Sequence, residues 1–197
     1  MSDPEAERKR DAEATAGRIL VCAQKVFHEK GYDGATTREI AECAGVNIAL
    51  IARYFGSKLG LFEKAVLPYL SLERFLNEPI DDLADRLADT YVNTAPKPGF
   101  DPFVVLLRSI SNPEVGPLLT NALETQAVDP LARALGGGDA RARAILIATQ
   151  LAGLILRFRI LQRGPESDAE RDAIHQRLLR YLDALISDDH VQSARSP

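Results

Sequence analysis

The chain has 197 residues, of which 46% are hydrophobic and 6% aromatic, so a packed core is expected and a disordered chain is excluded. Its formal net charge is −4, which argues against a uniformly basic nucleic-acid-binding protein. Residues 1–64 carry ten basic and ten acidic side chains, so the net negative charge comes from residues 65–197. Any basic surface must therefore be a local patch in the first third of the chain.

Cysteine usage and apolar runs indicate the cellular context. Cys22 and Cys43 have neither metal-ligand nor CxxC spacing, so we expect two reduced, small core residues in a cytoplasmic protein. The N-terminal residues lack the apolar core of a signal peptide. The longest apolar run, residues 144–156, is shorter than the ~18 residues that a membrane span needs. We therefore expect neither secretion nor a membrane partner.

Helical spacing recurs along the chain and strand alternation is never sustained, which predicts an all-α fold of about nine helices. The first helix is expected at residues 4–30, and Gly31 should end it. The second should begin at Thr36, which forms a capping-box pattern with Glu39, and should end at Gly45.

The later helices follow the same signals. Asn47 is the expected N-cap of a short third helix that ends at Gly56. Ser57 should cap the fourth helix, and Pro68 should kink it. Glycine and proline breaks then separate further helices, which we expect at residues 80–94, 101–111, 113–135, 139–163 and 167–187.

The second and third helices, joined by a turn of about four residues, form a helix-turn-helix pattern. Gly45 can supply the left-handed turn, and Ile51 and Phe55 can pack against the first two helices. The other side chains of the third helix would then face outward. One helix of this kind fits the major groove of DNA.

Several side chains in this segment could contact a duplex. Small outward residues allow close approach to base edges, and Lys58 lies where helix N–H groups can bind a phosphate. The candidate DNA-binding residues are Thr36, Thr37, Arg38, Asn47, Ile48, Ala49, Ala52, Arg53, Tyr54 and Lys58. Spacing alone is equally compatible with an ordinary helical hairpin, so a protein-interaction adaptor without DNA binding remains the alternative.

The segment TREIAECAGVNIALIARYFGSKLGLF, residues 37–62, resembles the DNA-binding domain of the TetR family of bacterial regulators. The family pattern is carried by Thr37, Ile40-Ala41, Ala44-Gly45-Val46, Tyr54-Phe55, Ser57-Lys58 and Leu61-Phe62. The resemblance implies that phosphates are held by Thr37, Tyr54 and Lys58. It implies that bases are faced by Ile48, Ala49 and Ala52. Ala49 and Ala52 stand where the family often has Gly and Tyr, so no base preference can be carried over.

The resemblance also implies an all-helical second domain that binds a small-molecule effector and dimerises. The protein would then be a repressor that binds a palindromic double-stranded DNA operator as a homodimer. Residues 144–156 are apolar almost all round, which independently predicts a helix buried on two sides. Candidate interface residues are Ile145, Ala148, Ala152, Ile155, Ile174, Leu178 and Tyr181. A central helix within a monomer is the alternative.

The effector pocket is expected among the helices that follow the fourth. Its candidate lining residues are Leu70, Phe75, Leu87, Tyr91, Phe103, Leu107, Ile110, Leu119, Leu123, Gln126 and Arg157. The apolar members also fit plain core positions. Arg157 could anchor an acidic effector or form an interface salt bridge, and the effector's identity stays open.

These elements predict a helix-turn-helix domain at residues 1–58, with its motif at about 36–55. An effector-binding and dimerisation domain would follow at 59–190, and a flexible tail at 191–197. The three histidines are scattered, and neither a catalytic triad nor metal-ligand spacing occurs. We therefore expect no enzyme activity, no catalytic residue, no metal and no cofactor.

Overall fold

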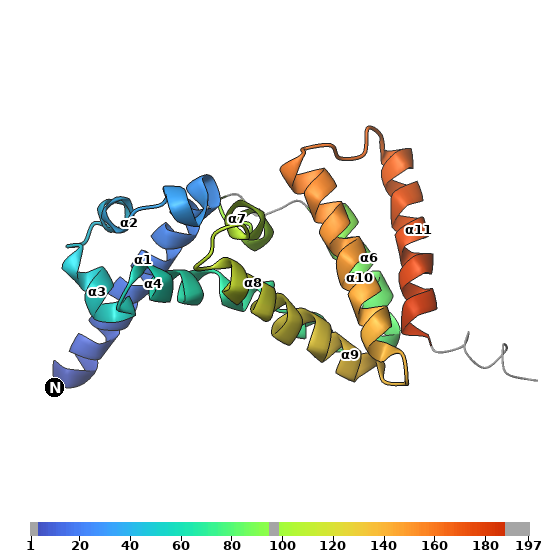
Figure 1. Cartoon of the computed structure of the whole chain (residues 1–197), viewed down its shortest axis with the longest axis horizontal. Helices are drawn as coiled ribbons and strands as arrows, with labels where there is room; N and C mark the ends of the chain where they lie inside the picture. Colours follow the sequence, from blue (N-terminus) through green and yellow to red (C-terminus); the bar gives the residue numbers. More distant parts are fainter. Residues whose placement is uncertain (1–3, 95–98, 188–197) are drawn as a thin grey trace, which may run out of the picture. The chain divides into compact units, whose positions relative to one another are not determined.

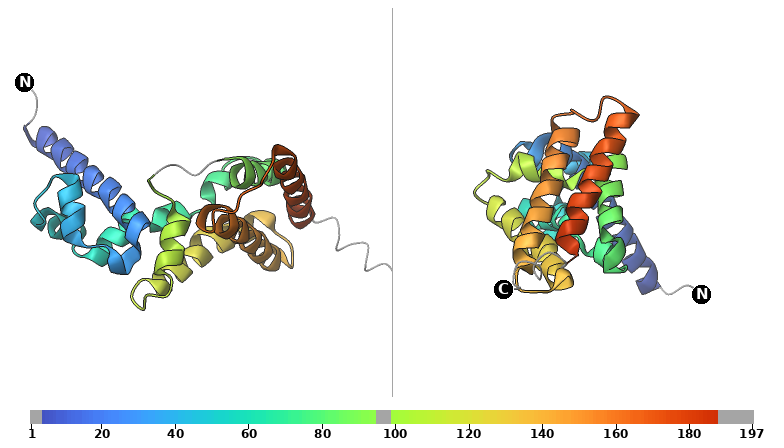
Figure 2. Two further views of the ribbon diagram at one scale, coloured as in Figure 1. Left: turned by 90° about the horizontal axis from the view of Figure 1, so that it is seen from above. Right: turned by 90° about the vertical axis from the view of Figure 1, so that its right-hand side faces the viewer.

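The computed structural model describes residues 4–94 and 99–187 (Figures 1 and 2). Within these ranges the chain forms helices and turns without a strand, which confirms the all-α prediction. The chain divides into two compact units, residues 1–70 with 97–120 and residues 71–96 with 121–197. The boundary predicted after residue 58 falls inside the first unit, and the predicted tail lies outside the described residues.

Helix α1 (Pro4–Gly34) is the scaffold of the first unit. Ile19, Ala23 and Phe27 recur every four residues and are fully buried, as their spacing predicts. Gly31 interrupts the helix with φ +68°. A Cβ there would lie 3.1 Å from Arg108 of α7 (Pro102–Ser109), so glycine also lets α7 approach.

Three short helices follow in the first unit: α2 (Thr37–Ala44), α3 (Ala49–Phe55) and α4 (Lys58–Ala65). Figure 1 shows them beside α1. The prediction that α4 continues through a kink at Pro68 is wrong, because α4 ends at Ala65 and a 3-10 helix follows at Leu67–Leu70. Pro68 has no N–H with which to continue an α-helix, so the chain turns more tightly there.

An aromatic cluster joins α1 to α4. The Phe27 and Phe62 ring centroids are 5.0 Å apart, and those of Tyr32 and Phe62 are 5.2 Å apart, both edge to face. All three side chains are buried. Each buried phenylalanine contributes about 1.5–3 kcal/mol through removal of apolar surface from water. This cluster therefore fixes the direction in which α4 leaves the helix-turn-helix.

In the second unit the observed helices are shorter than the long helices that were predicted. Its elements are α5 (Glu73–Leu76), a 3-10 helix (Ile80–Asp82), α6 (Leu83–Ala88), a π-helix (Asp89–Asn93), a second π-helix (Glu124–Val128), α9 (Asp129–Leu135), α10 (Ala140–Ile155), a third π-helix (Leu156–Ile160) and α11 (Asp168–Ile186). Helix α8 (Gly116–Leu123) carries the chain from the first unit into the second. Helix α11 packs along α6 and α10 (Figure 2).

Helix α10 has one buried and one exposed side. Ala144, Ile147 and Leu151 face the core of the second unit, whereas Ile145 and Leu146 are 42% and 48% exposed. The list of interface candidates needs a correction, because Ile155 is only 2% exposed and Leu178 of α11 only 4%. Both lie on the inward stripes of their helices and are core residues of the single chain.

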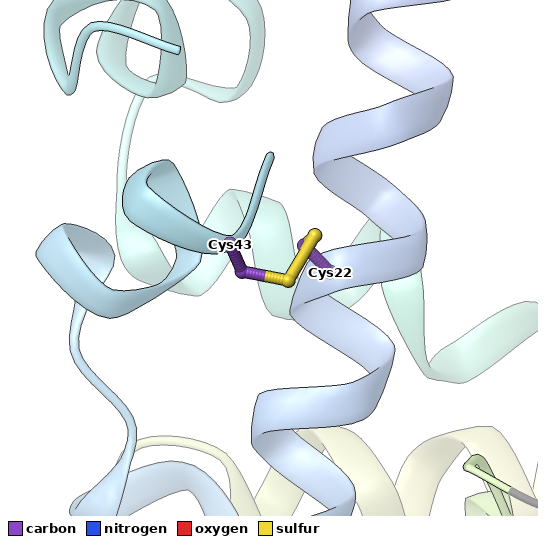
Figure 3. The surroundings of a disulfide bond; sticks show 2 residues. All are labelled: Cys22 and Cys43. Atoms are coloured by element: carbon purple, nitrogen blue, oxygen red, sulfur yellow. A yellow bond between two sulfur atoms is a disulfide. The ribbon is translucent and has the colours of Figure 1, made fainter. Parts of the chain in front are cut away.

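Cys22 of α1 and Cys43 of α2 form a disulfide, with their Cα atoms 5.8 Å apart (Figure 3). The prediction of two reduced core cysteines is wrong, and Cys43 is exposed while Cys22 is half-buried. The reason is that Ile40 and Ala44 pack α2 onto α1. Cys43 lies between these two residues in α2, so its side chain comes to the edge of the contact with α1. Sequence spacing contains no sign of this proximity.

Candidate nucleic-acid interface

The start of α2 is held by the predicted capping box. The Thr36 hydroxyl accepts a hydrogen bond from the Glu39 N–H at 3.2 Å, and the Thr36 N–H donates to Glu39 Oε2 at 3.1 Å. The Thr36 hydroxyl also donates to Glu39 Oε2 at 2.9 Å. Glu39 pairs with Lys30 of α1, and these hydrogen bonds from Lys30 and then Thr36 lower the pKa of Glu39. The Thr36 side chain thus serves the helix end, while Arg38 beside it is exposed.

The turn between α2 and α3 closes on Gly45. Its backbone is left-handed, with φ +63° and ψ +39°, and its N–H donates to the carbonyls at the end of α2. The Val46 N–H donates to the Ala41 carbonyl at 3.0 Å. This is the bonding of a glycine C-cap, which lets the chain reverse direction within one residue. The turn was read correctly from the sequence.

Helix α3 begins one residue later than predicted. Asn47 Oδ1 accepts from the Ala49 N–H at 2.9 Å, and the regular helix starts at Ala49. Ile51 is 1% exposed and anchors the helix against the unit's core. Phe55, the second predicted anchor, is half-buried. A helix of seven residues depends on such anchoring, because it is too short to be stable alone.

The outward face of α3 is the one that the sequence predicted. Its exposed members are Asn47, Ile48, Ala49, Ala52 and Arg53, and Ile48 is 48% exposed. Tyr54, which follows Arg53 at the end of this face, is half-buried, and so is Thr37 on α2. The Arg53 guanidinium lies 6.0 Å from the centre of the Tyr54 ring. Amide, methyl, guanidinium and phenol groups are therefore displayed together on one short helix and its edge.

The connection from α3 to α4 depends on two glycines. Gly56 has φ +76° and ends α3. The Ser57 hydroxyl then accepts from the Gly60 N–H at 3.0 Å and caps α4. A Cβ at Gly60 would lie 2.2 Å from the Phe55 carbonyl oxygen, so only glycine lets α4 start this close to the end of α3. Sequence reasoning did not single out Gly60; a glycine within an otherwise helical pattern was the available signal.

Lys58, the predicted phosphate contact, begins α4 and is half-buried. Its ammonium lies 4.3 Å from the centre of the Tyr32 ring. Burial lowers the pKa of Lys58, and the negative charges of Asp33 and Glu114 oppose that effect. The Tyr32 hydroxyl donates to Glu114 Oε2 at 2.6 Å. Tyr32 and Glu114 were not among the predicted site residues, because nothing local in the sequence connects them to Lys58.

The candidate effector residues are divided between the two units. The first unit holds Leu70, Phe103, Leu107, Ile110 and Leu119, and the second holds Phe75, Leu87, Tyr91, Leu123, Gln126 and Arg157. Leu107 and Arg157 are exposed. In the second unit a cavity of about 440 Å³ is lined by Tyr91 together with Phe158, Arg159 and Arg171, among other side chains. Only Tyr91 of this lining was predicted.

Over residues 4–94 and 99–187, no helix combines the length and hydropathy that crossing a membrane requires. Among the same residues, histidine, cysteine, aspartate and glutamate side chains do not gather in a group of three that could hold a metal ion.

Two family models match the chain. Residues 19–65 match the model described as bacterial regulatory proteins, tetR family, and residues 81–186 match the tetracyclin repressor-like C-terminal domain. The first match contains α2, α3 and α4, with the whole candidate interface. The second covers more than half of the chain.

Known proteins are similar to parts of the chain. The probable HTH-type transcriptional regulator YttP of Bacillus subtilis is 43% identical over 53 residues, which cover 27% of this chain and 26% of YttP. The HTH-type transcriptional repressor BdcR of Escherichia coli is 34% identical over 72 residues, covering 36% of this chain and 34% of BdcR. The chain thus spans about a quarter to a third of the length of these curated relatives.

The fold is also found among solved structures. NalD of Pseudomonas aeruginosa, the secondary repressor of the MexAB-OprM multidrug efflux pump, matches with a TM-score of 0.68. The match covers 86% of this chain and 97% of NalD at 19% identity. At this identity the likeness concerns the fold alone.

Proposed function

The chain belongs to the TetR family of bacterial regulatory proteins, and from that premise we propose that it is a DNA-binding transcriptional repressor. It would bind a palindromic operator as a homodimer in the bacterial cytoplasm and release it when a small molecule binds. The observation that carries this proposal is the exposed face of α3, which Ile51 anchors to the core of the first unit.

Each group of candidate residues has a proposed role. Ile48, Ala49 and Ala52 would approach base edges, because small and apolar side chains permit close contact. Arg53 and Asn47 would add polar contacts in the groove. Phosphates would be held by Thr37, Arg38, Tyr54 and Lys58, because the hydroxyl and N–H groups of Thr36 are engaged in the capping box. Phosphate contacts position the protein, whereas base contacts give specificity.

The exposed apolar residues of the second unit support a homodimer. Ile145 and Leu146 on α10 and Tyr181 on α11 are each more than a third exposed. A groove between the two helices is lined by residues that include Gln150 and Leu154. A two-fold contact of α10 and α11 with their copies would cover this surface and supply the two α3 helices that a palindromic operator requires. Ala148, Ala152 and Ile174 would lie in the same interface.

The effector site is proposed within the second unit, at the cavity beside Tyr91 and the predicted residues of that unit. Coupling of about 1–3 kcal/mol between effector and operator would change operator affinity by roughly 5- to 150-fold. No catalytic role is proposed for any residue.

DNA binding is tested with the full chain and with duplexes that tile the DNA upstream of its own gene. One duplex should bind specifically, and its affinity should fall steeply with salt as counterions are released. Lys58→Ala should weaken binding to all duplexes alike and reduce the salt slope by about 0.9 per lost phosphate contact. Lys64→Ala, at the exposed opposite end of α4, is the matched control and should bind as wild type does.

If no duplex binds at low salt, the chain is a helical interaction adaptor and the repressor proposal is wrong. The dimer is tested separately by sedimentation of Ile145→Asp. This variant should be monomeric, because a carboxylate cannot be buried unpaired in an apolar interface. Val21→Asp, at an apolar residue of α1 that is 66% exposed, is its control and should remain dimeric.

A further inference from the structure

We propose that Tyr32 and Glu114 form a resting site for the Lys58 ammonium. This site and a DNA phosphate would compete for the same ammonium. Tyr32 and Glu114 would then be positioning residues that set the affinity of the phosphate contact. This inference rests on the proposed DNA-binding function. It concerns a cluster that joins three separate segments of the first unit: the end of α1, the start of α4 and the turn before α8.

Tyr32 is a rigid platform. Its side chain is 5% exposed, and its ring lies against Phe27 with centroids 6.2 Å apart and against Phe62 at 5.2 Å. Its backbone N–H donates to Ser109 Oγ at 3.0 Å in a buried hydrogen bond. The ring therefore cannot follow Lys58 if the lysine moves. The ammonium, 4.3 Å from the ring centre, either occupies this face or leaves it.

Glu114 strengthens the attraction of this face for a cation. Its carboxylate accepts a hydrogen bond from the Tyr32 hydroxyl at 2.6 Å, and a phenol that donates to an anion has a more electron-rich ring. Burial, followed by the hydrogen bond to Glu114, raises the pKa of Tyr32, so the phenol remains protonated and continues to donate. Asp33 adds a second carboxylate charge that acts on Lys58.

The turn that carries Glu114 is also held firmly. Asn112 Oδ1 accepts from the N–H groups of Glu114 and Val115 at 2.8 and 3.0 Å, and its Nδ2 donates to Asp33 Oδ1 at 2.6 Å. A Cβ at Gly116 would lie 2.4 Å from the Ile110 carbonyl oxygen, so the turn is as tight as glycine permits. Glu114 is thus fixed at the cluster, and Lys58 is its adjustable member.

A phosphate at the start of α4 must draw the ammonium away from this site. Without the Glu114 charge, the ammonium is held less strongly at the Tyr32 ring. A DNA phosphate can then draw it away at a lower cost in free energy. Glu114→Gln should therefore tighten binding to any duplex. The gain must pass through Lys58 and should vanish when Lys58 is absent.

The test is a double-mutant cycle on the full chain, with a 20-base-pair duplex of arbitrary sequence and anisotropy as the readout. Glu114→Gln should tighten binding roughly two- to five-fold, the range that an exposed cation–π contact spans. In a Lys58→Ala background the same change should have no effect. Glu42→Gln on α2 is the matched control: any gain from removing that exposed charge should persist without Lys58. Thermal melts check that each variant folds.

A DNA-independent readout separates this inference from the proposed function. The ε-methylene resonance of Lys58, assigned by its loss in Lys58→Ala, should be shifted upfield by the Tyr32 ring and should move toward its random-coil value in Glu114→Gln. If no duplex binds but this shift is present, the DNA-binding function fails and the resting contact stands. A random-coil position in the wild type overturns the inference, as does an equal gain from Glu114→Gln with and without Lys58.

Discussion

Replacing Gly60 with alanine should destabilise the protein, although alanine is the better helix former. The added Cβ would lie 2.2 Å from the Phe55 carbonyl oxygen. Carbon and oxygen atoms in contact are normally about 3.3 Å apart, so the start of α4 and the end of α3 must separate by roughly 1 Å. The obstacle is a backbone atom, which no side-chain rotation can move aside.

The net cost follows from two opposing terms. Forcing extra volume into a packed site costs about 1–3 kcal/mol, and replacing a helical glycine with alanine returns about 0.5–1 kcal/mol. The difference between these terms is a loss of up to about 2.5 kcal/mol, centred on about 1 kcal/mol. For a chain of this size, each kcal/mol lowers the melting temperature by roughly 2–4 °C.

The measurement is thermal unfolding followed by circular dichroism, with Gly17→Ala as the matched control. Gly17 lies in α1 with no atom within 4 Å of an added Cβ, so its alanine variant should be more stable by about 0.5–1 kcal/mol. Gly60→Ala should also weaken DNA binding, because the forced separation displaces Lys58 from α3. A Gly60→Ala protein that melts at or above the wild-type temperature would refute this account of the α3–α4 junction.

Two further outcomes concern the attachment of α2. Thr36→Ala removes the hydroxyl that caps α2 and leaves the backbone N–H bond to Glu39 in place, which should cost about 1 kcal/mol, measured by urea unfolding; an unchanged midpoint would show that the hydroxyl contributes nothing. The Cys22–Cys43 bond closes a loop of 21 positions, which in the chain-entropy estimate stabilises the first unit by about 3 kcal/mol. A reductant should therefore lower the melting temperature of the wild type and leave Cys43→Ser unchanged, whereas equal sensitivity of the two proteins would contradict a role for this bond.

The helix-turn-helix could be predicted because its determinants are local. Thr36 and Glu39 are one helical turn apart, Gly45 needs only its own backbone freedom, and Ser57 caps through a bond to Gly60 three residues on. Bonds over three or four positions leave a pattern that can be read along the chain. The outward face of α3 followed from the same pattern once its inner face was recognised.

The errors came from contacts between segments far apart in the sequence. Cys22 and Cys43 meet only because α2 packs across α1, and Ile155 and Leu178 are buried because α10 and α11 turn those stripes inward. Periodicity marks a residue as apolar and gives its face, but it does not say which neighbour covers that face. An interface position and a core position therefore look alike in the sequence.

The amino-acid sequence by itself determined that this protein is helical, where its recognition motif lies and how that motif is capped. Only the tertiary structure decided where the Lys58 ammonium rests, because Tyr32 and Glu114 are 82 positions apart and approach each other through the packing of α1 against α7. Local hydrogen bonds are encoded by residues that are neighbours in the chain. The surroundings of a charge are set by whichever distant segments the core brings beside it.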